Sequence, residues 1–116
     1  LSQIRRLEHL IDQEKGVDLI IDIINKGDTD DQGYDISESA INRLGYKLVV
    51  AKNNFDALRI LKLNTEKYPN AFNTYDSYGE ILLVTGDKEN AIKAYKKSLE
   101  LNPDNENAKK VLSEIK

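Results

Sequence analysis

The chain has no cysteine, methionine or tryptophan and only two prolines. The lack of cysteine excludes disulfides, zinc sites with thiolate ligands and cysteine nucleophiles. It does not indicate a compartment, because a cysteine-free chain tolerates oxidising and reducing surroundings alike. No apolar run approaches the roughly 18 residues that a bilayer-spanning helix needs, and no signal peptide is visible at the start. Membrane insertion is therefore not expected.

The bulk composition indicates one soluble globular domain. The 116 residues fit a single domain, and 40% hydrophobic with 32% charged residues is typical of a folded chain. A net charge of -3 and a pI near 5.2 repel phosphate backbones, so a nucleic-acid partner is not expected. Because the chain opens at Leu1 and not at a methionine, we interpret it as a fragment or a processed product.

A repeat with a fixed period is the main internal pattern. Residues 38–71 align without a gap on residues 72–105. The matched positions hold small residues, large apolar residues and prolines: Gly45 and Gly79, Leu48 and Leu82, Ala57 and Ala91, Leu61 and Tyr95, Pro69 and Pro103. Such a period predicts two copies of one supersecondary unit.

Helical spacing predicts that each unit is a pair of helices. In the first unit, apolar residues at 41, 44, 48 and 51 form one stripe, and those at 55, 57, 58 and 61 form the next. Lys52–Asn54 is the expected loop between them. The second helix must end by Tyr68, because Pro69 disfavours helical geometry at the residue before it.

Capping residues predict the remaining helix ends. Gly86 and Asp87 indicate a helix stop followed by an N-cap, and Asn102–Pro103 closes the last long helix. Asp35, three residues before Glu38, predicts a capping box that opens the first unit.

Two glycines lie in the middle of predicted helices, Gly45 and Gly79. Glycine costs roughly 1 kcal/mol relative to alanine at such a position. The matched pair therefore indicates a structural role: without a side chain, the partner helix can approach closely. Ala57 and Ala91 are the small residues expected on the facing helices.

The N-terminal segment, residues 1–37, contains two further apolar stripes. They fall at 4, 7, 10 and 11 and at 17, 20, 21 and 24, with Gly16 between them. We expect two helices that pack on the first unit as a degenerate hairpin or as a connector. A strand at Leu19–Ile24 is the alternative, because that stretch is rich in β-branched residues. Lys26–Gly33 is expected to be an acidic loop.

The C-terminal segment, residues 106–116, predicts a single capping helix. Val111, Leu112 and Ile115 give it an apolar face, and Asp104 or Asn105 would be its N-cap. A terminal helix of this kind covers the last exposed stripe of a repeat array.

Tests for catalytic or metal chemistry find no complete constellation. His9 is the only histidine and has no partner at a suitable spacing. Asp28–Gly33 resembles the first half of an EF-hand loop, but the fifth position is Gln32 and the twelfth is Ser39, so a solvated acidic turn is expected. Ser113 and Lys116 match a Ser-x-x-Lys spacing by chance, because no pocket-forming body surrounds them. We expect no enzyme activity and no cofactor.

The repeat resembles the tetratricopeptide repeat (TPR) family, whose 34-residue unit is a pair of antiparallel helices. The family's large–large–Gly–large pattern appears twice, as Ile41, Leu44, Gly45, Leu48 and as Tyr75, Tyr78, Gly79, Leu82. The resemblance implies an all-α fold in which hairpins stack as a short right-handed superhelix with a capping helix.

In that family the first helix of each hairpin lines a concave face. The resemblance therefore implies a protein-interaction module with a peptide-binding or docking groove, and the alternative is that these helix faces are merely solvated. The implied groove residues are Asn42, Tyr46, Val49, Val50, Asn73, Asp76, Ser77, Glu80 and Leu83, continued by Lys110 and Glu114. Some TPR domains clamp a chaperone's C-terminal carboxylate with cations. The matching positions here are Asn42, Tyr46, Ser77, Asn107 and Val111, which lack a cation, so no such binding is expected.

A narrower resemblance covers roughly residues 16–115. Stretches such as Tyr34–Glu38, Tyr75–Glu80 and Ser98–Pro103 are similar to the C-terminal TPR tails of bacterial β-lactamase-related and esterase-type serine hydrolases. This resemblance implies a bacterial protein of the cytoplasm or periplasm, and a non-catalytic tail that docks in cis on an upstream domain or mediates dimerisation. Thr65 and Ala71–Phe72 depart from the pattern of those tails.

Overall fold

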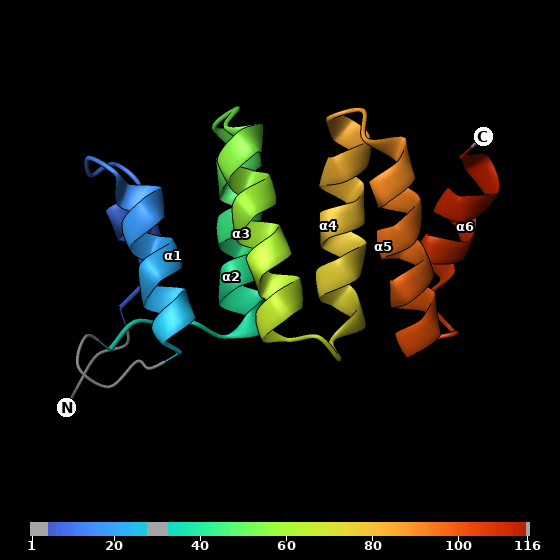
Figure 1. The fold of residues 1–116 in the computed structure, drawn as a ribbon, viewed down its shortest axis with the longest axis horizontal. Helices are drawn as coiled ribbons and strands as arrows, with labels where there is room; N and C mark the ends of the chain where they lie inside the picture. Colours follow the sequence, from blue (N-terminus) through green and yellow to red (C-terminus); the bar gives the residue numbers. More distant parts are fainter. Residues whose placement is uncertain (1–4, 28–32, 116) are drawn as a thin grey trace.

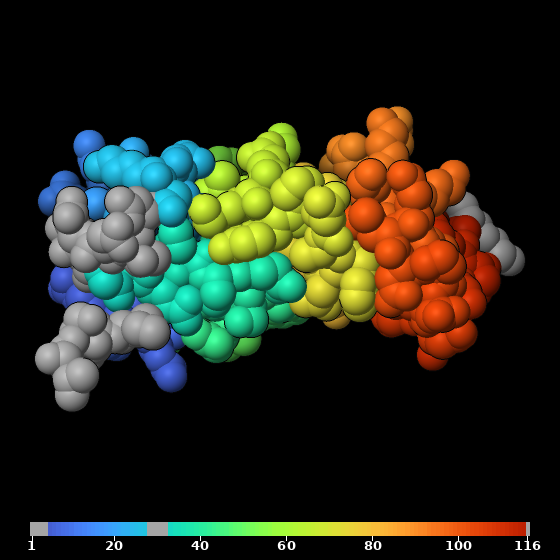
Figure 2. Space-filling model, turned by 90° about the horizontal axis from the view of Figure 1, so that it is seen from below, coloured from blue at the N-terminus to red at the C-terminus, as the bar shows by residue number. Residues whose placement is uncertain are grey.

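The structure, a computed structural model, describes residues 5–27 and 33–115. These residues form one short 3-10 helix and six α-helices: η1 Leu7–Leu10, α1 Gly16–Lys26, α2 Glu38–Val50, α3 Asn54–Lys67, α4 Phe72–Val84, α5 Lys88–Leu101 and α6 Glu106–Glu114. The α-helices follow one another along the longest axis of a body measuring 47 × 27 × 18 Å (Figure 1). The space-filling view shows the same order from blue to red (Figure 2). The expected all-α fold is confirmed.

Two antiparallel hairpins form the centre of the array. Helices α2 and α3 pack together, α4 and α5 pack together, and α3 packs on α4 (Figure 1). Helix α4 starts at Phe72, which aligns in the repeat with Glu38 at the start of α2. Helix α5 starts at Lys88, which aligns in the same way with Asn54 at the start of α3. The sequence period is therefore also a period of the structure.

Polar caps start four of the helices. The side chains of Ser37, Asn53, Asp87 and Asn105 each accept a hydrogen bond from a backbone N–H in the first turn of α2, α3, α5 and α6. The prediction of Asp35 as the cap of α2 is wrong. Its carboxylate accepts the N–H of Ser37 at 3.0 Å instead, so it orders the turn before the cap.

The mid-helix glycines allow a close approach within each hairpin. A Cβ placed on Gly45 would lie 2.4 Å from Cδ2 of Leu61, and one on Gly79 would lie 2.9 Å from Cε2 of Tyr95. Leu61 and Tyr95 are themselves almost fully buried. The large residues of the second helix thus fill the space above the glycine, and Ala57 and Ala91, which were expected there, are not the nearest neighbours.

A buried hydrogen bond recurs at the other end of each hairpin. Asn64 Nδ2 donates to the carbonyl of Glu38 at 3.0 Å, and Ser98 Oγ donates to the carbonyl of Phe72 at 2.9 Å. Both donors are fully buried, and both acceptors are the first residue of a hairpin. Each bond joins the last turns of the second helix to the start of the first. Asn64 and Ser98 occupy the same position of the repeat, so an amide in one hairpin and a hydroxyl in the other make the equivalent contact.

The N-terminal segment packs on the first hairpin. Leu7, Ile20 and Ile24 belong to the same buried cluster as Ile41 and Leu44. The first predicted helix is only a 3-10 turn, and its predicted residue 4 lies outside the described residues. The chain reverses directly after the turn, since a Cβ on Gly16 would lie 1.9 Å from the carbonyl oxygen of Leu10. The second predicted helix is α1, so the strand alternative at Leu19–Ile24 is wrong.

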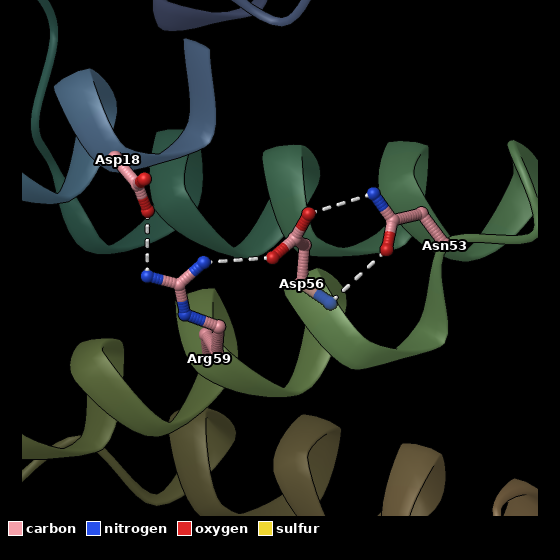
Figure 3. A network of polar contacts seen from close by, with 4 residues as sticks. All are labelled: Asp18, Asn53, Asp56 and Arg59. Carbon is pink, nitrogen blue, oxygen red and sulfur yellow. Dashed lines mark hydrogen bonds and ion pairs between the residues drawn. The ribbon is translucent and has the colours of Figure 1, made fainter. Parts of the chain in front are cut away.

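The join between α1 and the first hairpin is also polar, which the apolar stripes do not show. Arg59 on α3 donates from its two terminal nitrogens to Asp18 on α1 and to Asp56, each at 2.8 Å (Figure 3). Asp56 in turn accepts from the Nδ2 of Asn53, the N-cap of α3, at 2.8 Å. Because Asp18 and Arg59 are exposed, this ion pair adds little to stability beside the buried apolar contacts between α1 and the first hairpin.

Three further details differ from the predicted pattern. Phe55 was assigned to the buried stripe of α3, but it is 75% exposed, and the guanidinium of Arg59 lies over its ring. The loop between α2 and α3 consists of residues 51–53 and not of the expected residues 52–54, because α2 ends at Val50 and α3 begins at Asn54. Lys26 ends α1 and is not part of the acidic loop, whose residues 28–32 lie outside the described ranges.

The glycine contacts generate the first prediction. Gly45→Ala and Gly79→Ala should each lower the free energy of unfolding by about 1–3 kcal/mol through overpacking, despite the better helix propensity of alanine. Gly45→Ala should cost more, because its added carbon has the shorter contact. Urea denaturation followed by circular dichroism measures this. Asn25→Ala on the exposed side of α1 is the control for helix propensity, and equal stability of all variants would contradict the packing account.

The recurring buried hydrogen bond generates the second prediction. Ser98→Ala leaves the carbonyl of Phe72 without its buried donor and should lower the free energy of unfolding by about 1–3 kcal/mol. Ser113→Ala is the matched control, because Ser113 is exposed and its hydroxyl only donates to the carbonyl of Lys110 within α6. Thermal denaturation of both variants tests this. The interpretation fails if the two substitutions shift the melting temperature equally.

Candidate functional site

The first helices of successive units, α2, α4 and α6, form a row of side chains that we call the first-helix surface. Its members occupy equivalent positions in each unit: Asn42 and Tyr46 on α2, Asn73, Asp76 and Glu80 on α4, and Asn107, Lys110 and Glu114 on α6. Helices α2 and α4 contact each other directly. Hydrogen bonds from Tyr46 to Glu80 and from Asn107 to Asp76 show that side chains of neighbouring first helices meet in this row.

Tyr46 links α2 to α4. Its hydroxyl donates a hydrogen bond to Oε1 of Glu80, which occupies the same place in the second unit. The pKa of Tyr46 is raised to about 12, first by burial and then by the bond to Glu80. The hydroxyl therefore stays a neutral donor at physiological pH. Glu80 is exposed and keeps acceptor capacity for another molecule.

Asp76 links α4 to α6. One carboxylate oxygen accepts from Asn105 Nδ2 at 2.8 Å, and the other accepts from Asn107 Nδ2 at 3.0 Å. Asn105 Nδ2 also lies 2.9 Å from Ser98 Oγ, so it ties α6 to α5 as well. These bonds fix the capping helix and the carboxylate together. Within the first-helix surface, hydrogen bonds therefore hold Tyr46, Glu80, Asp76 and Asn107 without a ligand.

The predicted groove residues differ in exposure. Ser77 is only 4% exposed and lies beside the hydroxyl of Tyr46, so it supports this surface from below and does not face a ligand. Val49 and Leu83 are half-buried, Asn73 is exposed, and Val50 is 83% exposed. Asn42 is half-buried, and its Oδ1 has no hydrogen-bond partner among the described residues. Of the predicted groove residues, the structure joins Tyr46 to Glu80 by a hydrogen bond, whereas Asp76 binds Asn105 and Asn107.

The electrostatic character of this surface is amide and acidic. Helix α4 carries Asp76 and Glu80 and no lysine or arginine. The amides of Asn42, Asn73 and Asn107 are uncharged, and Lys110 and Glu114 on α6 offset each other. The surface therefore suits a ligand that offers N–H donors or a positive charge.

Sequence reasoning missed Asn105 as a link and treated Asn107 only as a position without a cation. A signal was present: Asn107 stands one repeat period after Asn73 and shares its place in the unit. Asn73 lies one turn before Asp76 on α4, so Asn107 on α6 lies one turn before the position that corresponds to Asp76. A comparison of equivalent positions between units would have paired Tyr46 with Glu80 in the same way.

No second chemical centre is found among residues 5–27 and 33–115. No group of three or more histidine, cysteine, aspartate or glutamate side chains there is placed to hold a metal ion. His9 is exposed, and the EF-hand-like residues 28–32 and Lys116 of the Ser-x-x-Lys spacing lie outside these ranges. None of the helices in the described part has both the length and the apolar content to span a bilayer.

A comparison with known protein families finds a match for the second hairpin. Residues 72–105 match the model of the tetratricopeptide repeat family, and these bounds enclose α4, α5 and the turn that leads to α6. No curated protein matches the chain. The first hairpin has the same helix starts, mid-helix glycine and buried hydrogen bond one repeat period earlier. The described residues therefore form an all-α helical repeat similar to the TPR fold, and residues 72–105 match the TPR family.

Proposed function

We propose that the chain is a protein-interaction module that binds an extended or helical peptide segment along the first-helix surface. The observation that carries the proposal is the polar row in which Tyr46 on α2 binds Glu80 on α4, and Asp76 on α4 binds Asn107 on α6. Such a row offers acceptors at fixed spacing beside the apolar side chains of Val49 and Leu83. A partner can bind it by side-chain and main-chain hydrogen bonds.

Charge indicates the kind of partner. Asp76 and Glu80 stand one turn apart on α4 without a basic neighbour on that helix. A partner segment with lysine or arginine next to an apolar residue complements this arrangement. Because Tyr46 and the two asparagines already hold the carboxylates, little side-chain entropy is lost on binding. The mechanism is passive presentation of a preformed surface.

The resemblance to serine hydrolase tails stays a prediction. In that setting the same surface would dock on an upstream catalytic domain or on a second copy of the chain. The proposal assigns no catalysis to these residues in either case. Intermolecular and intramolecular docking would use the same side chains, so the binding experiment below applies to both.

The third prediction concerns Glu80. Glu80→Gln keeps an oxygen that accepts the Tyr46 hydroxyl but removes the charge, so binding of a peptide of alternating lysine and leucine should weaken about three- to tenfold. Glu89→Gln on α5 is the matched control, because Glu89 is exposed and lies outside the first-helix surface. Fluorescence anisotropy of the labelled peptide measures both variants.

Two further results bear on the same proposal. Tyr46→Ala should weaken the peptide more than Glu80→Gln, because it removes the ring and frees Glu80 from its position. Raising the ionic strength should weaken binding to the wild type more than to Glu80→Gln. If Glu89→Gln reduces affinity as much as Glu80→Gln, binding follows net charge alone and the first-helix surface is not the site.

A further inference from the structure

A second candidate site lies on another side of α4. By helical spacing, Tyr75 and Tyr78 point away from the row of Asn73, Asp76 and Glu80. Together with α3 and α5, which flank α4 in the array (Figure 1), they enclose a cleft of about 360 Å³. Its lining residues are Lys62 and Thr65 on α3, Tyr75 and Tyr78 on α4, and Asn90, Lys93, Ala94 and Lys97 on α5. We call it the lysine cleft.

The lysine cleft is positively charged in a chain whose net charge is -3. Three of its eight lining residues are lysines and none is acidic. Within the described part of the chain, Lys62 and Lys93 form no ion pair, and Lys97 has one contact of 3.4 Å with the exposed Glu100. Solvent screens that pair strongly. The ammonium groups of Lys62 and Lys93 are therefore available to a ligand, and that of Lys97 can exchange Glu100 for a ligand.

A hydroxyl donor complements the lysines. Tyr78 is half-buried in the cleft, and its hydroxyl has no hydrogen-bond partner among the described residues, whereas that of Tyr75 donates to the carbonyl of Pro69. The pKa of Tyr78 is raised by burial and then by the nearby carboxylates of Asp87 and Glu66, neither of which lines the cleft. The hydroxyl thus stays protonated and able to donate.

The shape of the cleft favours a peptide over a small anion. Its lining runs from Asn90 to Lys97, which is two turns of α5 or roughly 10 Å. Three residues of extended chain cover the same distance. Between the charges lie the rings of the two tyrosines, Ala94 and the aliphatic stems of the lysines, which offer apolar contact. A lone phosphate or carboxylate would use one end and leave this apolar part empty.

We propose that the lysine cleft binds an acidic segment of a partner protein, with aspartate or glutamate side chains next to an apolar residue. The donors are the ammonium groups of Lys62, Lys93 and Lys97 and the hydroxyl of Tyr78. This site goes beyond the function proposed above, because it uses a different face of α4 and the opposite ligand charge. The array would then hold two different segments, one basic and one acidic.

The test uses a labelled peptide of alternating glutamate and leucine and the same peptide with glutamine in place of glutamate. The folded full chain should bind the glutamate peptide more tightly. Lys93→Gln with Lys97→Gln should weaken it about tenfold, since each exposed charge contact contributes modestly. Tyr78→Phe, which removes only the hydroxyl, should weaken it a few-fold. Glu80→Gln should leave it unchanged, which separates this site from the first-helix surface.

The matched control is Lys47→Gln with Lys109→Gln, which removes the same charge from exposed positions on α2 and α6. Circular dichroism checks that all variants fold. The proposal is overturned if this control weakens binding as much as the cleft variant, or if the glutamine peptide binds equally well. Equal affinity for inorganic phosphate would assign the cleft to a free anion and would likewise overturn the peptide proposal.

Discussion

The close approach of two helices within each hairpin is the constraint on which the rest of the structure depends. Gly45 lies under Leu61 and Gly79 lies under Tyr95, so the large residue of the second helix packs onto the backbone of the first. A buried side-chain hydrogen bond to the start of the first helix closes the other end of the hairpin. With both ends fixed, each hairpin behaves as a unit that stacks on the next, and the outward-facing side chains acquire defined positions.

The stacking produces two faces of different character. Successive first helices come together, which pairs Tyr46 with Glu80 at the equivalent position and Asp76 with Asn107, one turn from the equivalent position. The second helices bring Lys62 on α3 into one cleft with Lys93 and Lys97 on α5. The net charge of the chain is only -3, but acidic side chains gather on one face and lysines on another. This separation of charge becomes apparent only in the folded chain. Composition alone would suggest an evenly solvated surface.

Much of the fold follows from local signals in the sequence. The matched glycines, the prolines and the polar residues before each helix predict hairpin bounds within one or two residues, because they act through backbone geometry. The prediction that Phe55 is buried is wrong because periodicity does not show where the buried stripe of a helix ends. The prediction of Asp35 as the cap is wrong because Ser37, two residues later, caps α2 instead. The Asp18–Arg59 contact joins α1 to α3, and the lysine cleft depends on how α3, α4 and α5 pack side by side, so no spacing rule within one helix predicts them. The site residues were predicted as positions, but their hydrogen-bond partners were not.

The central claim is that one array presents two separate binding faces of opposite charge. It is tested most directly by backbone amide NMR shifts recorded during titration with a basic peptide and then with an acidic peptide on the same sample. The account predicts that the basic peptide perturbs amides near Asn42, Asn73 and Glu80, and that the acidic peptide perturbs those near Lys62, Lys93 and Lys97, without mutual displacement. Perturbation of one common set of amides by both peptides, or displacement of one peptide by the other, would contradict it.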